Sequence, residues 1–200
     1  MEVSCGRVRN VSFEAKMFNR RAANPRYQPN RILDALALQR GQWVADIGSG
    51  GGYFTLRFAH VVGPEGRVYA VDTNPNMLDF VKQSVREKGL DNVVPVLVEG
   101  DALPLPENSL NLVFMRNVCH HVPHRVTYFQ QVKHVLRPDG TVALIEYRRS
   151  GLFRRLFGHY IPPETLRTEM KDAGYHIRES FDFLPDQSFT LFTVQTKPPT

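Results

Sequence analysis

The chain has 200 residues, 42% of them hydrophobic, with two cysteines and a formal net charge of +5. This length suits one domain that buries about 70% of its unfolded surface. Two cysteines are too few for a disulfide framework or a zinc cluster, so no metal site is indicated. The sequence contains no run of about 18 apolar residues, so no membrane span is predicted, and the first 25 residues lack the apolar region of a secretory signal. We therefore expect a reducing, cytoplasmic location.

The positive charge is concentrated at the N-terminus. Residues 1–31 hold seven basic and two acidic side chains, whereas the other 169 residues hold 18 of each. The sequence thus predicts a basic N-terminal arm or helix (1–28) in front of a neutral domain (29–200). Such an arm suits nucleic acid or an anionic lipid surface, and a solvated helix explains the charge equally well.

Apolar runs alternate with helical patterns along the domain, which predicts βαβ units and a mainly parallel sheet. One helix should begin at Pro75 and end at Gly89, a second should follow Pro123, and a third should follow Pro162. In chain order, the predicted strands are 42–48, 67–72, 93–101, 110–117, 141–147, 175–183 and 189–195.

Only residues 184–188 join the last two predicted strands. This connection is too short for a right-handed crossover, so the two strands should be antiparallel neighbours. The expected fold class is therefore α/β, with a Rossmann-like, doubly wound, seven-stranded sheet that is mostly parallel and ends in an antiparallel C-terminal hairpin.

A glycine-rich turn, VADIGSGGGYF (44–54), follows the first predicted strand. A dinucleotide fingerprint would need a glycine where Tyr53 stands, and a phosphate loop would need a lysine that is missing here. The pattern that fits is D-x-G-x-G-x-G, formed by Asp46, Gly48, Gly50 and Gly52. Spaced glycines of this kind allow a ligand to approach the backbone closely.

This pattern resembles motif I of the class I S-adenosylmethionine-dependent methyltransferases. Other landmarks of that family follow in its order: Asp72 ends the second strand, Asp101 ends the third, 118–121 follow the fourth, and 136–141 precede the fifth. Over residues 28–196 the chain is similar to the small-molecule branch, grouped with the methyltransferases of ubiquinone and menaquinone biosynthesis.

The resemblance implies S-adenosylmethionine as cofactor and methyl transfer to a small-molecule acceptor, lipophilic or acidic. It assigns the ribose diol to Asp72, the adenine edge to Asp101 with Ala102, and the amino acid part of the cofactor to the backbone near Asn117. Taken alone, Asp72 would also suit capping of the helix that follows it, but beside the glycine motif the ribose role is favoured. The full set of implied cofactor-binding residues is Asp46, Gly48, Ser49, Gly50, Gly52, Tyr53, Asp72, Thr73, Met77, Asp101, Ala102, Arg116 and Asn117.

The catalytic candidates are His120 and His121. Methyl transfer from a sulfonium needs mainly the positioning of donor and acceptor, and it needs a base only if the acceptor must lose a proton. Histidine, with an ordinary pKa of about 6.5, suits that role. Either histidine suits the role of base. The alternative is that one of them has only a structural role and packs beneath the next helix.

The acceptor is less well indicated. An apolar stripe flanked by arginines in 148–157 suits a lid over the substrate, or at most a peripheral contact with an anionic membrane. Residues 117–120 lack the paired prolines of enzymes that methylate nitrogens of DNA or protein. The alternatives are an RNA-directed methyltransferase that uses the basic arm and a non-catalytic subunit that binds S-adenosylmethionine. No oligomeric state follows from the sequence.

Overall fold

The computed structural model describes residues 5–100, 102–148 and 160–194, with side chains from residue 13 onward. The chain divides into two compact units, Met1–Ala102 and Leu103–Thr200, which are described in turn. Asp101 and most of the predicted basic apolar stretch lie outside the described residues. Within the described ranges, no helix combines the length and apolar character that a membrane span requires.

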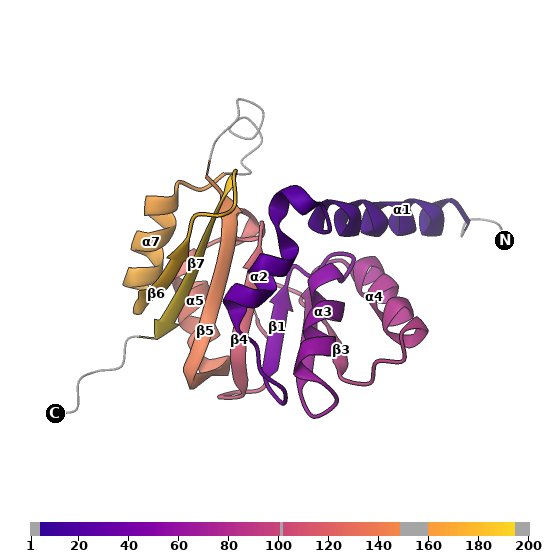
Figure 1. The fold of residues 1–200 in the computed structure, drawn as a ribbon, viewed down its shortest axis with the longest axis horizontal. Coiled ribbons are helices and arrows are strands. Elements are labelled where there is room, and N and C mark those ends of the chain that lie inside the picture. Colours follow the sequence, from indigo (N-terminus) through magenta and orange to yellow (C-terminus); the bar gives the residue numbers. More distant parts are fainter. Residues whose placement is uncertain (1–4, 101, 149–159, 195–200) are drawn as a thin grey trace. The chain divides into compact units, whose positions relative to one another are not determined.

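The first unit alternates strands and helices after two N-terminal helices (Figure 1). Its elements are α1 (Cys5–Ala22), the short 3-10 helix η1 (Pro25–Tyr27), α2 (Pro29–Leu36), β1 (Trp43–Ile47), α3 (Tyr53–Val62), β2 (Arg67–Asp72), α4 (Pro75–Glu87) and β3 (Val93–Leu97).

The three strands of this unit are parallel and lie in the order β3-β2-β1. Tyr69 of β2 is the register partner of Ala45 in β1 and of Val94 in β3. Four of the five residues of β1 and four of the six residues of β2 are buried, as expected for parallel strands with helices on their faces. The helices contribute Phe58 and Val81, both fully buried, to this core.

Helix α4 has the limits that the sequence predicts. Asn74 is its N-cap, and the Asn74 side chain accepts a hydrogen bond from the backbone N–H of Asn76. Pro75 occupies the first helical turn, where its missing N–H costs nothing. Gly89, with φ +61°, follows the helix in the left-handed region.

The second unit holds the remaining four strands. Its elements are β4 (Leu110–Arg116), the 3-10 helix η2 (Cys119–His121), α5 (Arg125–Val135), β5 (Leu136–Tyr147), α7 (Pro163–Asp172), β6 (Tyr175–Phe181) and β7 (Gln187–Val194). The strand order is β4-β5-β7-β6: β4 and β5 are parallel, and β7 is antiparallel to both β5 and β6. A bulge interrupts the pairing of β6 with β7 between Ile177 and Glu179.

Several boundaries differ from the prediction. The third strand ends at Leu97 rather than at 101, and the last two strands are joined by residues 182–186 rather than 184–188. The fifth strand begins at Leu136 rather than 141, because the predicted turn 138–140 is a bulge in the strand that shifts its register with β4. Helix α5 begins at Arg125, since its N-cap residue His124 has a left-handed φ of +46° that no helix accommodates.

The seven strands confirm the predicted fold class: an α/β protein with a mostly parallel sheet and an antiparallel C-terminal pair. The hairpin prediction is also confirmed, since β6 and β7 are antiparallel neighbours.

Candidate active site

The glycine loop between β1 and α3 has an unusual backbone conformation. Gly48, Gly50 and Gly52 have φ values of +71°, +51° and +80°, in the left-handed region that other residues rarely adopt. The backbone N–H groups of Gly48 and Ser49 both donate to the Val71 carbonyl, at 2.8 and 3.1 Å. The loop is thereby fixed to the end of β2, with its backbone close to that strand.

Asp72, at the end of β2, is hydrogen-bonded to this loop. One carboxylate oxygen accepts the Gly50 N–H at 2.9 Å, and the other accepts the Asn74 N–H at 2.9 Å. An ionised carboxylate offers about four acceptor positions, so two remain for a ligand hydroxyl pair. The two predicted features, the glycine loop and the Asp72 carboxylate, are therefore in direct contact. Thr73, also predicted to bind the cofactor, is exposed.

Asp46 is buried beneath the loop rather than displayed on it. One of its carboxylate oxygens accepts a hydrogen bond from the Thr55 hydroxyl at 2.5 Å, and both residues are buried. This bond ties β1 to α3 on either side of the glycine loop. Such satisfied polar contacts are the rule for buried polar groups.

The other predicted residues in and near this loop differ in their polar contacts. The Ser49 hydroxyl is buried and has no hydrogen-bond partner among the described residues. Such an atom usually belongs to a site completed by a water or a ligand. Tyr53 is half-buried, and its hydroxyl accepts a hydrogen bond from the Arg57 guanidinium at 2.8 Å. Met77, also predicted to contact the cofactor, is buried on α4.

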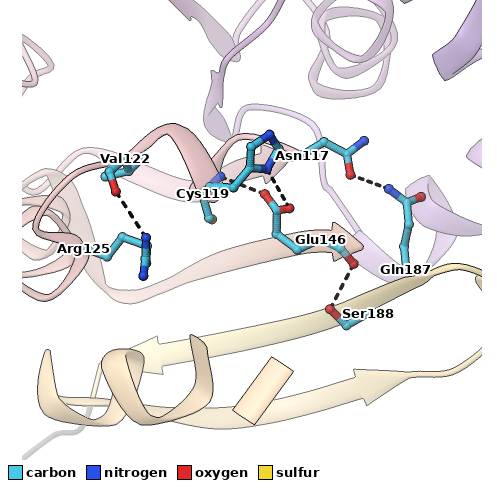
Figure 2. A network of polar contacts seen from close by, with 8 residues as sticks. Asn117, Cys119, Val122, Arg125, Glu146, Gln187 and Ser188 are labelled. Carbon is cyan, nitrogen blue, oxygen red and sulfur yellow. Dashed lines mark hydrogen bonds and ion pairs between the residues drawn. The ribbon is translucent and has the colours of Figure 1, made fainter. Parts of the chain in front are cut away.

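In the second unit, a buried carboxylate organises the segment after β4. Glu146 of β5 is only 1% exposed, and one of its oxygens accepts the Cys119 backbone N–H at 2.8 Å (Figure 2). The other oxygen lies 3.1 Å from Nδ1 of His120. An ionised Glu146 can only accept, and the proton of this bond then belongs to Nδ1, which leaves the basic lone pair of the neutral ring on Nε2.

The two candidate histidines differ in their surroundings. The His120 side chain is 5% exposed and is oriented by Glu146, whereas His121 is exposed. Their rings are adjacent, with centroids 4.2 Å apart. The contact with Glu146 therefore fixes the orientation of the His120 imidazole, which a general base requires.

Cys119, which directly precedes His120 in sequence, is a buried free thiol. Burial, and next the nearby Glu146 carboxylate, raise the pKa of this thiol well above its ordinary value. The thiol therefore stays protonated at neutral pH and is unsuited to nucleophilic chemistry. Its structural contribution is the backbone N–H that it donates to Glu146.

The end of β4 is held by a second buried side chain. Gln187 is fully buried, and its amide donates to the Asn117 side-chain oxygen at 2.6 Å (Figure 2). Its own carbonyl lies 3.5 Å from the Arg116 guanidinium. Asn117 has a φ of +56°, and its backbone N–H donates to the Ile145 carbonyl at 2.8 Å. Arg116 and Asn117, both predicted cofactor residues, thus share one positioning residue.

Within each unit, the structure brings several of the predicted residues together. In the first unit, Gly50 contacts Asp72; in the second, Arg116 and Asn117 share Gln187. Ala102 is exposed. The polar residues that sequence reasoning missed are Asn19, Glu146 and Gln187.

Comparisons with known proteins agree with this arrangement. A sequence profile of the family described as "Methyltransferase domain" matches residues 45–144. The ubiquinone/menaquinone biosynthesis C-methyltransferase of Shewanella frigidimarina is 28% identical over 170 residues, 81% of this chain and 68% of that protein. The demethylmenaquinone methyltransferase of Geobacillus stearothermophilus is 33% identical over 133 residues, 64% of this chain and 56% of that protein.

Among solved structures, a SAM-dependent methyltransferase from Aquifex aeolicus has a TM-score of 0.76 at 23% identity, covering 89% of this chain and 95% of that chain. The fold is thus that of the S-adenosylmethionine-dependent methyltransferases. Because the profile matches half of its residues, the chain belongs to the methyltransferase-domain family.

The predicted enzyme class and the predicted cofactor, S-adenosylmethionine, are thereby confirmed. The RNA-directed alternative gains no support from these relatives.

Proposed function

We propose that this enzyme methylates a small organic acceptor whose reacting atom is deprotonated by His120. The observation that supports this proposal is the pairing of His120 with the buried Glu146 carboxylate, at 3.1 Å, directly after β4. S-adenosylmethionine, when bound, supplies an electrophilic methyl group on a sulfonium and leaves as S-adenosylhomocysteine. The chain's own part is to orient the acceptor, take up its proton and exclude water.

The proton is received at Nε2 of His120. The acceptor's carbon or oxygen loses its proton to Nε2, and the electron pair left on the acceptor forms the new bond to the methyl group. Glu146 keeps the imidazole in the reactive tautomer and stabilises the imidazolium that forms, as a buried carboxylate does for histidine bases in general. His121, which is exposed, is not the base in this proposal.

Cofactor binding is assigned to the residues that the resemblance implies. The glycine loop would approach the cofactor through its backbone, and the Ser49 hydroxyl, buried without a partner, would complete a hydrogen bond there. Asp72 would accept the ribose hydroxyls with its remaining lone pairs. Tyr53, Thr73, Met77, Asp101 and Ala102 would contribute further cofactor contacts, and Arg116 and Asn117 would bind the amino acid part.

For the acceptor, we infer a lipophilic, acidic ring compound of the quinol type. The names of the two curated relatives, which refer to ubiquinone, menaquinone and demethylmenaquinone, support this inference. A quinol ring fits the proposed base, because loss of a hydroxyl proton to Nε2 delocalises the electron pair onto the neighbouring ring carbon, which then bonds the methyl group. The proton on that carbon returns to the oxygen as the ring regains its aromaticity, so the net proton released is the one that His120 holds.

The test compares the two histidines with methyl-labelled S-adenosylmethionine and chemically reduced demethylmenaquinone. We expect His120→Ala to lower kcat roughly 10²–10³-fold, which lies within the usual contribution of a general base. His121→Ala is the matched control and should stay within a few-fold of wild type. Binding of S-adenosylhomocysteine should be equal in all three proteins. Full turnover by His120→Ala would sink the assignment of the base.

A further inference from the structure

The N-terminal helix α1 is hydrogen-bonded to the glycine loop through one side chain, that of Asn19. Its amide N–H donates to the Gly51 carbonyl at 2.7 Å, and its amide oxygen accepts the Tyr53 backbone N–H at 3.1 Å. The two bonds bracket Gly52, so Asn19 binds the loop on both sides of its last left-handed residue. Figure 1 shows α1 beside α3 and α4, both of which it contacts.

Helix α1 leaves no room for a side chain at Gly51. A Cβ atom at Gly51 would collide with the Ala15 carbonyl oxygen and would lie 2.5 Å from the Asn19 amide oxygen. Unlike Gly48, Gly50 and Gly52, Gly51 is not in the left-handed region, so its backbone alone does not require glycine. The close approach of α1 therefore explains the extra glycine of the GSGGG loop.

Apart from Ala15 and Asn19, the described side chains of α1 are mostly exposed. Among its described side chains only Ala15 is fully buried, whereas Phe13 is 70% and Met17 48% exposed. Phe18 is 39% exposed, and a Cβ atom added at Gly50 would lie 3.7 Å from its ring, so this side chain packs near the loop. Among the described side chains of α1, Ala15 and Phe18 thus provide the apolar contact, and the bidentate Asn19 amide provides hydrogen bonds to the loop.

We propose that Asn19 is a positioning residue for the cofactor, and that it fixes the loop before the cofactor binds. This inference rests on the proposed cofactor-binding role of the loop. A loop with four glycines in five residues has high conformational entropy when unrestrained, and ordering it on binding lowers affinity. Asn19 restrains the carbonyl of Gly51 and the N–H of Tyr53, while Asp72 restrains the N–H of Gly50. Together they preorganise the backbone that approaches the ligand.

The experiment measures the Kd of S-adenosylhomocysteine by calorimetry with the full chain. Asn19→Ala removes both hydrogen bonds, and we expect about ten-fold weaker binding. Asn19→Asp keeps the acceptor for the Tyr53 N–H but loses the donor to Gly51, so it should lie between Asn19→Ala and wild type. Gly51→Ala leaves Asn19 intact but pushes α1 away, and should weaken binding as Asn19→Ala does. Lys16→Ala, an exposed change on the same helix, is the control and should bind like wild type.

The double variant Asn19→Ala/Gly51→Ala separates coupled from independent effects. If both changes act by releasing the same contact, the Kd of the double variant should be no higher than the Kd of the single variant that binds more weakly. The thermal midpoint of each variant is measured without ligand, and we expect it to change by only a few degrees. A purely structural role of Asn19 would give the opposite result, a large shift of the midpoint with an unchanged Kd.

The outcomes are separable. If wild type fails to bind S-adenosylhomocysteine, the proposed function fails, and this inference fails with it. If wild type binds and Asn19→Ala binds within two-fold of it, only the role of Asn19 is wrong. Equal weakening by Lys16→Ala would also overturn it, because the effect would then belong to the helix as a whole. If Asn19→Ala does not fold, Asn19→Asp and Gly51→Ala decide by the same criterion.

Discussion

The glycine loop of the first unit and the segment after β4 in the second unit are stabilised in different ways. The loop is held at its backbone atoms, by Asp72 at Gly50 and by Asn19 at Gly51 and Tyr53. The segment after β4 is held mainly by buried side chains from strands distant in sequence, Glu146 and Gln187.

This difference has a consequence for how each region responds to change. In the loop, several separate hydrogen bonds restrain the same backbone, so loss of one of them should reduce ligand affinity only partly. Around β4, one buried side chain satisfies two groups at once, so a single loss leaves buried polar groups without partners. We therefore expect loss of the buried Glu146 carboxylate in the second region to reduce function and stability more than loss of any single contact of the loop.

The largest effect should come from Glu146→Ala. We expect kcat to fall roughly 10²–10³-fold, because His120 loses the group that sets its tautomer and stabilises its charged form. The free energy of unfolding should fall by about 1–3 kcal/mol, since the Cys119 N–H loses its buried acceptor. Initial rates and urea unfolding measure the two effects.

Two further variants make this test sharper. Glu146→Gln keeps an acceptor for the Cys119 N–H, so it should recover stability without recovering turnover. Ser188→Ala removes only a 3.2 Å hydrogen bond to the Glu146 backbone carbonyl and serves as the matched control. Turnover by Glu146→Ala equal to that of Ser188→Ala would contradict the prediction.

A smaller loss is expected at the carboxylate of the first region. Asp72→Ala should weaken binding of S-adenosylhomocysteine about 10–100-fold, because two charge-assisted hydrogen bonds to ligand hydroxyls and the restraint on Gly50 are lost together. Asp79→Asn, a change to an exposed carboxylate on α4 paired with Lys82, should leave the Kd unchanged. Calorimetry gives both values, and equal Kd values for the two variants would remove Asp72 from the cofactor site.

The effect of Gln187→Leu should be smaller again. This change removes the hydrogen bond to Asn117 but fills the buried space, so we expect binding of S-adenosylhomocysteine to weaken about five-fold and unfolding to cost ~1 kcal/mol less. Gln83→Ala, which removes an exposed hydrogen bond to Glu87 on α4, is the control. Unchanged affinity in Gln187→Leu would show that Asn117 needs no support from β7.

The smallest effect concerns pH in the second unit. Burial raises the pKa values of the Cys119 thiol and of the Tyr128 and Tyr175 phenols. Above the ordinary pKa values of these groups, the unfolded chain releases protons that the folded chain retains, so stability should fall as pH rises. We expect the thermal midpoint to decline from about pH 9 upward.

Tyr175→Phe tests this pH dependence. It loses one hydrogen bond, to the Phe129 carbonyl at 2.9 Å, and should be less stable at pH 8 but show a shallower alkaline decline. Parallel declines for wild type and Tyr175→Phe would exclude this phenol as a cause.

The sequence predicted features that local chemistry determines. The limits of α4 follow from Asn74, Pro75 and Gly89, all of which act on backbone groups within a few residues. The pairing of the glycine loop with Asp72 was likewise accessible, because parallel strands place their carboxyl ends at one edge of the sheet.

The positioning residues were not predictable, because their partners are distant in sequence. Glu146 lies in an apolar run that predicts only a buried strand, and its pairing with His120 depends on the register of β5. Gln187 and Asn19 are ordinary polar residues until β7 and α1 are placed. One signal was available: a charged residue within a fully buried strand needs a partner.

The bulge between β6 and β7 also has a consequence for solubility. In the second unit β6 ends the strand order, and its exposed residues include His176, Arg178 and Glu179. An irregular outermost strand with charged side chains is a poor template for the strand of another molecule. This margin of the sheet is therefore protected against self-association into extended β aggregates, even though Ile177 is 44% exposed there.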